Sequence, residues 1–331
     1  MNRTFAPLCL YCSILLFASS PATAVTIAWT VVGNAGNAGD PADGDSSTPG
    51  IQHYGAVAYA YKIGKYDVTN SQYIEFLNAK DPTGTNTLGL YNSDMSDATL
   101  GGIHFTAGNA NGGKYSVISG RGNHPANSVT WYDAIRFANW LNNGQGNSDI
   151  ETGAYTILGG TPTPTNGLSI TRNAGATVFL PSEDEWYKAA YYNPVTSSCF
   201  LYPTSSNMTP TGTAPTATPN SANCNAVVNQ PTNVGAYTGT TSPYGAFDMG
   251  GNVNQWNEAL IDGSFRGYRG GSFDNVVFGL ESSLRANFDP ASESSLIGFR
   301  VASVPEPSTA LLAVLACGLM WWKRQSFRRV A

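Results

Sequence analysis

Residues 244–256 read YGAFDMGGNVNQW and form the most informative segment of this chain. Two adjacent glycines stand among side chains that carry oxygen atoms, namely Asp248, Asn252 and Gln255. Glycine lets the backbone turn so that carbonyl groups point inward, and oxygen ligands from a tight loop suit Ca²⁺. Clusters of Asp, Gly and Asn are also typical of ordinary turns. Alone, the segment predicts a tight loop that is either a calcium site or a plain turn.

Three helices are indicated by their N-terminal caps. Thr69 with Gln72 and Ser182 with Glu185 are capping boxes, and Thr130 with Asp133 is a looser version of the same motif. Apolar residues follow each cap at helical spacing, and Gly144 is the expected end of the second helix. Short strand-like pieces occupy residues 57–66, 177–180 and 298–301 between Gly, Asn and Pro turns. We predict one α+β domain with little regular secondary structure and a core rich in aromatic side chains.

Both ends differ from the remainder of the 331-residue chain. Residues 1–24 are typical of a signal peptide, with an apolar run followed by the small-x-small cleavage motif Ala22-Thr23-Ala24. Residues 304–331 contain an apolar run over 310–322, which we expect to form a short transmembrane helix, followed by a basic tail typical of the cytoplasmic side. The domain between them covers residues 25–303.

The charge balance argues against nucleic acid as a partner. Residues 25–303 contain 12 basic and 21 acidic residues, a net charge of about −9. Binding to phosphate backbones requires an excess of Lys and Arg, which this domain lacks.

Cys199 and Cys224 are the only cysteines of the exported domain. An even pair in an oxidising compartment predicts a disulfide, and the alternative is two unrelated buried thiols. The intervening segment is rich in Thr, Pro and Ser, and we expect that it cannot build a core of its own.

The usual signatures of catalysis are missing. Residues 25–303 contain no Gly-x-Ser-x-Gly, Walker, His-Glu-x-x-His or Cys-x-x-Cys motif. His53, His104 and His124 have no ligand spacing, so a metal site made from them would need the fold to bring them together. The acidic run of residues 183–185 lies in the first turn of a predicted helix, where it favours the helix dipole rather than acid–base chemistry.

Pro305, Glu306 and Pro307, followed by the apolar run and the basic tail, resemble the PEP-CTERM sorting signal of Gram-negative bacteria. The resemblance implies an exosortase as partner and a location in the cell envelope, on the outer surface or in the extracellular matrix. The alternative is an ordinary membrane anchor.

Six segments of the domain, in their order along the chain, resemble the sulfatase-modifying-factor family of formylglycine-generating enzymes. They are KYDVTN (65–70), HPANSVTWYDA (124–134) with NWL (139–141), LPSEDEW (180–186), YGAFDMGGNV (244–253), RGGSF (269–273) and GFRV (298–301). The resemblance covers about residues 50–302. It implies a variant of the C-type-lectin-like fold with structural calcium.

The resemblance also implies where metal ligands would lie. Calcium would be bound by the side chains of Asp248 and Gln255 and the carbonyls of Gly251 and Val253. A weaker first calcium site would use Asn223 and Cys224. The family binds copper through two cysteines, and their positions fall at Asn275 and Leu280 here. Neither side chain offers the thiolate that Cu(I) selects, so we expect the copper-dependent oxidase chemistry to be absent.

Two functions remain open. The first is a non-catalytic binding or structural domain of the envelope or extracellular matrix, with a polysaccharide or a protein as ligand. The second is a divergent oxidoreductase of the same family, of the formylglycine-generating or the non-haem iron type, that uses other ligands.

Overall fold

The computed structural model describes residues 24–41 and 53–304. The signal peptide, the sorting motif and the apolar run over 310–322 lie outside the described residues. Within the described part, no helix has both the length and the apolar character needed to cross a membrane.

The three predicted helices are confirmed, each with its capping box. They are α1 (Asn70–Lys80), α2 (Trp131–Asn142) and α3 (Glu183–Tyr191), and their N-caps are Thr69, Thr130 and Ser182. In each box the cap side chain accepts from a backbone N–H three residues on, and the third residue's side chain accepts from the cap N–H. Three short 3₁₀ helices, η1 (Ser93–Ser96), η2 (Gly167–Ser169) and η3 (Val277–Leu280), complete the helical part of the described chain.

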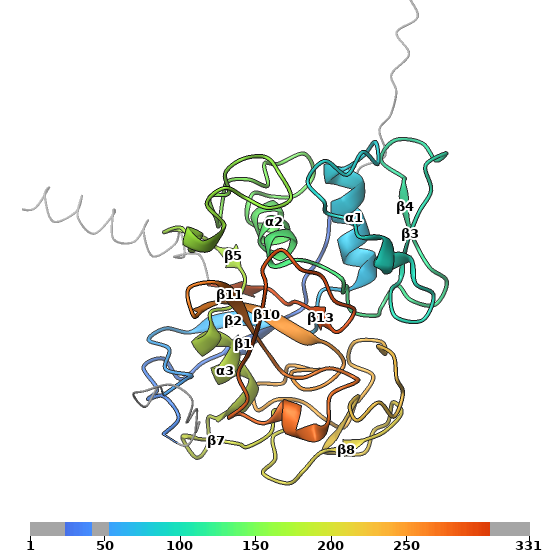
Figure 1. Ribbon diagram of the computed structural model, residues 1–331. Helices are drawn as coiled ribbons and strands as arrows, with labels where there is room; N and C mark the ends of the chain where they lie inside the picture. Colours follow the sequence, from blue (N-terminus) through green and yellow to red (C-terminus); the bar gives the residue numbers. More distant parts are fainter. Residues whose placement is uncertain (1–23, 42–52, 305–331) are drawn as a thin grey trace, which may run out of the picture.

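Two four-stranded sheets form the centre of the domain (Figure 1). The first has the order β1-β2-β14-β5 and is antiparallel throughout. The second has the order β12-β11-β10-β13, with β10 and β13 parallel. Their strands are β1 (Trp29–Val32), β2 (Tyr61–Gly64), β5 (Val178–Phe179), β14 (Ala302–Ser303), β10 (Asn254–Ile261), β11 (Phe265–Arg269), β12 (Ala286–Phe288) and β13 (Ile297–Gly298).

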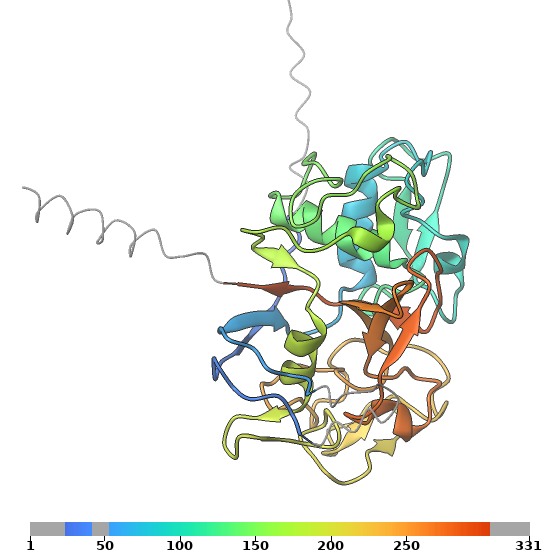
Figure 2. The same cartoon turned by 60° about the vertical axis from the view of Figure 1, so that its left-hand side comes forward.

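Three two-stranded sheets lie outside these two. They pair β3 (Ile103–Phe105) with β4 (Tyr115–Val117), β6 (Tyr192–Asn193) with β7 (Ser198–Cys199), and β8 (Thr211–Gly212) with β9 (Ser221–Ala222). Figure 2 shows α1 and α2 together at one end of the molecule, the segment around β8 and β9 at the other, and the larger sheets between them. The sparse regular structure confirms the predicted mixed α+β class.

The strand predictions are too long for residues 57–66 and 177–180 and wrong for most of residues 298–301. Only Tyr61–Gly64 of residues 57–66 is a strand. Residues 298–301 were predicted as one strand, but β13 ends at Gly298 and β14 begins at Ala302. The three residues between them carry the chain from one large sheet to the other. This crossing places Arg300, which is fully buried, between the two sheets.

The core is organised by aromatic side chains, as predicted. Trp131, Trp186 and Trp256 are each fully buried. Phe137 of α2 contacts both Phe76 of α1 and Phe299, with ring centroids 5.4 and 5.3 Å apart. Such edge-on pairs add to the free energy gained by burial alone.

The Thr/Pro/Ser-rich segment between the two cysteines packs against a residue from a distant part of the chain. Tyr202, Ala222 and Cys224 form a small hydrophobic cluster with Leu280, and Leu280 comes from η3. The segment is ordered because a distant residue completes its interior.

Candidate functional site

Asn254 and Gln255 are the first two residues of β10, and their side chains lie in two different environments. Successive side chains of a strand point to opposite faces of its sheet. Asn254 lines a pocket together with residues of β11 and η3, whereas Gln255 is fully buried among polar groups.

Gln255 has no free oxygen lone pair. Its Oε1 accepts hydrogen bonds from Trp186 Nε1 at 2.7 Å and from Arg300 Nε at 2.6 Å. Its Nε2 donates to the carbonyl of Asp248 at 2.7 Å. One amide therefore joins α3, β10 and the loop before β10.

Arg300 extends this network to the first large sheet. Its guanidinium donates to Asp67 Oδ1 at 3.0 Å and to the carbonyls of Gly64 at 2.8 Å and Phe247 at 2.9 Å. Asp67 Oδ2 has no hydrogen-bond partner in the described part of the chain. Burial raises the pKa of Asp67 to about 7, and the charge of Asp248 adds to the rise, while the Arg300 guanidinium opposes it.

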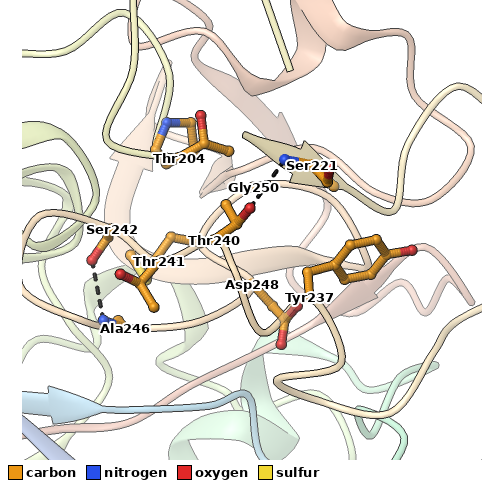
Figure 3. Close-up of a pocket in the computed structure, with 12 residues that line it drawn as sticks. Thr204, Ser221, Tyr237, Thr240, Thr241, Ser242, Ala246, Asp248 and Gly250 are labelled. Carbon is orange, nitrogen blue, oxygen red and sulfur yellow. Dashed lines mark hydrogen bonds between the residues drawn. The ribbon is translucent and has the colours of Figure 1, made fainter. Parts of the chain in front are cut away.

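Asp248 lies at the edge of a second, smaller pocket, shown in Figure 3. Its Oδ2 accepts a hydrogen bond from the Gly235 backbone N–H at 2.6 Å. Thr240, Ser242 and the ring of Tyr237 line the pocket beside it. The cavity volume is about 10 Å³, room for one water molecule or one small ion. Burial raises the pKa of Asp248 to about 6.

These contacts decide how well calcium fits the loop of residues 248–255. The carboxylate of Asp248 suits a cation, but Gln255 does not fit as a ligand because both lone pairs of its oxygen are occupied. The guanidinium of Arg300 also donates to the carbonyl of Asp248 at 3.3 Å, so a fixed positive charge already lies against the loop. The Gln255 part of the predicted ligand set therefore disagrees with the geometry.

The weaker calcium site retains one available oxygen. Asn223 is buried, and its Nδ2 donates to the Gln230 carbonyl at 2.9 Å and to Asn252 Oδ1 at 3.2 Å. Its Oδ1 has no partner within the residues that the structure describes, which suits a water or a cation. The carbonyl of Cys224, by contrast, already accepts from the Val227 N–H at 3.3 Å. No group of three His, Cys, Asp or Glu suited to a metal occurs among the described residues.

The pocket at Asn254 is larger than the pocket beside Asp248. Its cavity volume is about 60 Å³, which would hold a few water molecules or one substituent of a ligand. Asn254 and Asn275 supply amides, and Tyr268, Leu284 and Ala286 supply apolar surface. The remaining lining residues are Arg269 and the glycines 270, 271 and 279.

From the sequence, Asn275 was identified only as a family cysteine position, and Asn254 and Tyr268 were not named as site residues. The two-residue period of a strand was the available signal.

The two positions at which the family carries its copper-binding cysteines now have distinct structural roles. Asn275 Oδ1 accepts from the Ser272 N–H at 2.8 Å, from Ser272 Oγ at 2.9 Å and from Asn254 Nδ2 at 3.4 Å. Leu280 is fully buried in the cluster with Cys224. An occupied amide oxygen and a buried alkyl group do not fit copper.

The three histidines do not converge. His53 contacts the carbonyl of Asp40 at 2.9 Å, His104 is an exposed residue of β3, and His124 is half-buried. Burial lowers the pKa of His124 to about 4, so this ring is neutral at ordinary pH. The requirement of the iron-type alternative, that these histidines meet, is therefore not satisfied.

The acidic run at the start of α3 serves the fold, as predicted. Glu183 forms ion pairs with Arg269 and Arg285, each at 2.8 Å, and Glu185 forms an ion pair with Arg172 at 2.6 Å. The pKa of Glu185 is lowered, because the hydrogen bonds and the charge of Arg172 outweigh its burial.

The predicted disulfide between Cys199 and Cys224 is not formed in the structure. Cys199, on β7, packs against the main core, whereas Cys224 belongs to the small cluster with Leu280. Burial raises the pKa of the Cys224 thiol to about 11, which keeps it protonated.

Comparison with known proteins agrees with this architecture. A family model described as the sulfatase-modifying factor enzyme 1-like domain matches residues 19–304. No curated protein gives a significant match.

Three solved structures share the fold. The Treponema denticola variable protein 1 has a TM-score of 0.55 at 20% identity and covers 86% of this chain and 98% of its own. CarF has a TM-score of 0.54 at 20% identity, covering 85% and 99%. PvdO from Pseudomonas aeruginosa has a TM-score of 0.51 at 19% identity, covering 87% and 100%.

Proposed function

The chain belongs to the sulfatase-modifying factor enzyme 1-like domain family, and on this premise we propose that it is an exported, non-catalytic binding domain whose ligand enters the pocket between Asn254 and Asn275. The observation that carries the proposal is that Asn275 and Leu280, at the two cysteine positions, have structural contacts instead of metal-binding groups. Asn275 closes a hydrogen-bonded turn with Ser272, and Leu280 fills the interior of a cluster. A pocket therefore lies where the groups that the family resemblance implies for oxidation are replaced.

The chemistry of the pocket favours a neutral polysaccharide as ligand. Side-chain amides form hydrogen bonds with sugar hydroxyls, and the half-buried ring of Tyr268 offers an apolar face against which a sugar can pack. Val276 and Phe278, one and three residues after Asn275, are 64% and 54% exposed and offer further apolar surface. The negative charge of the domain disfavours acidic polymers.

Binding of the purified domain to immobilised neutral polysaccharides tests the proposal. Asn254→Trp fills the pocket with an aromatic side chain, so we expect binding to be lost, and the unfolding midpoint shows whether the variant is folded. Asn254→Ala, which removes one amide without adding bulk, should weaken binding. Val195→Trp is the matched control, because Val195 is 88% exposed and does not line the pocket.

Retention of polysaccharide binding by Asn254→Trp would overturn the pocket as the site. Binding only to a protein from the cell envelope would replace the ligand class but keep the pocket, provided that Asn254→Trp abolished it.

Display at the cell surface is part of the same proposal. Residues 305–307, the apolar run and the basic tail resemble a sorting signal. This resemblance supports our proposal that an exosortase sorts the protein to the envelope or the extracellular matrix. Intact-mass measurement of the protein from hosts with and without an exosortase tests this step. An identical C-terminus in both hosts would contradict it.

The alternative is a divergent oxidoreductase, and membership of the family is what favours it. Oxygen consumption in the presence of a cysteine-containing peptide, together with the copper and iron content of the protein, separates the two functions. Stoichiometric copper or iron with oxygen uptake would overturn the non-catalytic proposal.

A further inference from the structure

Val25 is the point at which the chain enters the folded domain. Ala24 is exposed, whereas Val25 is 9% exposed and belongs to the main hydrophobic core. The following residues are held in turn, since the carbonyl of Thr26 accepts from Gln72 Nε2 at 2.9 Å and that of Ala28 accepts from the Lys65 N–H at 2.7 Å. The chain is therefore fixed from Val25 onward.

One side-chain amide binds both backbone polar groups of Val25. The Val25 N–H donates to Gln145 Oε1 at 2.6 Å, and Gln145 Nε2 donates to the Val25 carbonyl at 2.8 Å. Gln145 lies 120 residues away in sequence, so this contact is a property of the fold and not of the local chain.

Gln145 is itself held firmly at the end of α2. Its backbone N–H donates to the Trp140 carbonyl at 2.8 Å, and the indole of Trp140 donates to the Gly146 carbonyl at 2.9 Å. Gln145 adopts a positive φ of 67°, a conformation uncommon for residues other than glycine. The surrounding turn therefore fixes the amide opposite Val25.

This place suits a positive charge better than a neutral peptide N–H. Gln145 follows the last residue of α2 by three positions, and the C-terminal end of a helix favours cations. A free α-amino group is mostly protonated at neutral pH and forms a stronger, charge-assisted hydrogen bond with an amide oxygen.

We infer that the peptide bond between Ala24 and Val25 is hydrolysed and that Gln145 binds the α-ammonium group released on Val25. Water, delivered by a signal peptidase, supplies the hydroxyl of the new Ala24 carboxylate and the hydrogen of the new amine, which then takes up a proton. The small-x-small motif of residues 22–24 precedes this bond. Cleavage comes before docking, because the Val25 N–H is engaged in the folded domain.

The first test is to express the full chain in a Gram-negative host and sequence the N-terminus of the exported product. We expect Val25 as the first residue. A product that begins at any other residue would overturn the cleavage site.

The second test separates the amine-binding role of Gln145 from a merely structural one. In the chain that begins at Val25, Gln145→Glu pairs a carboxylate with the ammonium group but loses the Nε2 donor to the Val25 carbonyl. In a chain that retains Ala22-Thr23-Ala24, the donor is lost without that ion pair, so we expect the substitution to lower the unfolding midpoint more there than in the chain that begins at Val25. An equal effect of Gln145→Glu in both chains would overturn the inference.

A labelling experiment covers the case in which Gln145→Glu does not fold. We expect the Val25 amine of the native protein to react several-fold more slowly with an acylating reagent than that of Gln145→Ala, as read by mass spectrometry of the N-terminal peptide. Labelling of the lysines serves as the internal control. Equal rates in the two proteins would contradict the bound amine.

Discussion

The two faces of β10 at Asn254 and Gln255 differ in whether they enclose a cavity. The Gln255 face is a closed network in which one amide and the guanidinium of Arg300 connect both large sheets. The Asn254 face opens into a cavity of about 60 Å³. A buried polar network rigidifies a fold, whereas a concave pocket is where a ligand can enter. Adjacent residues of one strand therefore line a packed interior and an open pocket.

Arg300→Met is expected to produce the largest effect on the closed face. The substitution keeps the length of the side chain but leaves Asp67 buried without its cation, which should cost about 3–5 kcal/mol of unfolding free energy. Urea denaturation measures this loss. A cost below about 1 kcal/mol, which is typical of an exposed ion pair, would contradict the stabilising role assigned to the Gln255 face.

Leu280→Ala tests the position at which the family carries its second copper ligand. Since Leu280 completes the small cluster with Tyr202 and Cys224, its truncation should cost about 2–5 kcal/mol. Asn275→Ala, at the other cysteine position, should cost less, about 1–2 kcal/mol, because it removes hydrogen bonds from a partly exposed turn. Equal costs in denaturation experiments would contradict the different roles assigned to the two positions.

The closed face also predicts how stability depends on pH. The folded state raises the pKa of Asp67 to about 7, above the ordinary value of 3.8. The folded protein therefore binds more protons than the unfolded chain between these values, and stability should fall as pH rises from about 4 to 7.

Denaturation at pH 5, 6, 7 and 8 checks the direction, with an expected change of about 3 kcal/mol from Asp67 alone. Asp67→Asn should reduce the slope without removing it, since burial also raises the pKa of Asp133 to about 7. A slope of the opposite sign would contradict the assignment.

Removal of divalent ions should have the smallest effect. Gln255 is engaged by Trp186 and Arg300, so the Asp248 loop is held together by side chains of the chain itself. We expect EDTA to leave the thermal midpoint unchanged. If calcium raised the midpoint, Asn223→Ala would show whether the free oxygen of Asn223 is the ligand.

Several features were predictable because their causes are local. The capping boxes at Thr69, Thr130 and Ser182 predicted three helices, since a cap and its partner lie three residues apart. The absence of cysteine at Asn275 and Leu280 was readable from the printed letters alone. What fills the two positions was not, because the direction of Leu280 depends on Cys224 and Tyr202 from a distant segment.

The amino-acid sequence by itself determined the family pattern, the helices, the aromatic core and the loss of the copper-binding thiols. Only the tertiary structure decided that Gln255 is engaged by Arg300, that Cys199 and Cys224 lie in separate clusters, and that Gln145 meets Val25. The physical reason is separation along the chain. Caps and turns depend on neighbours within a few residues, whereas hydrogen-bond partners 45 or 120 residues apart are selected by packing.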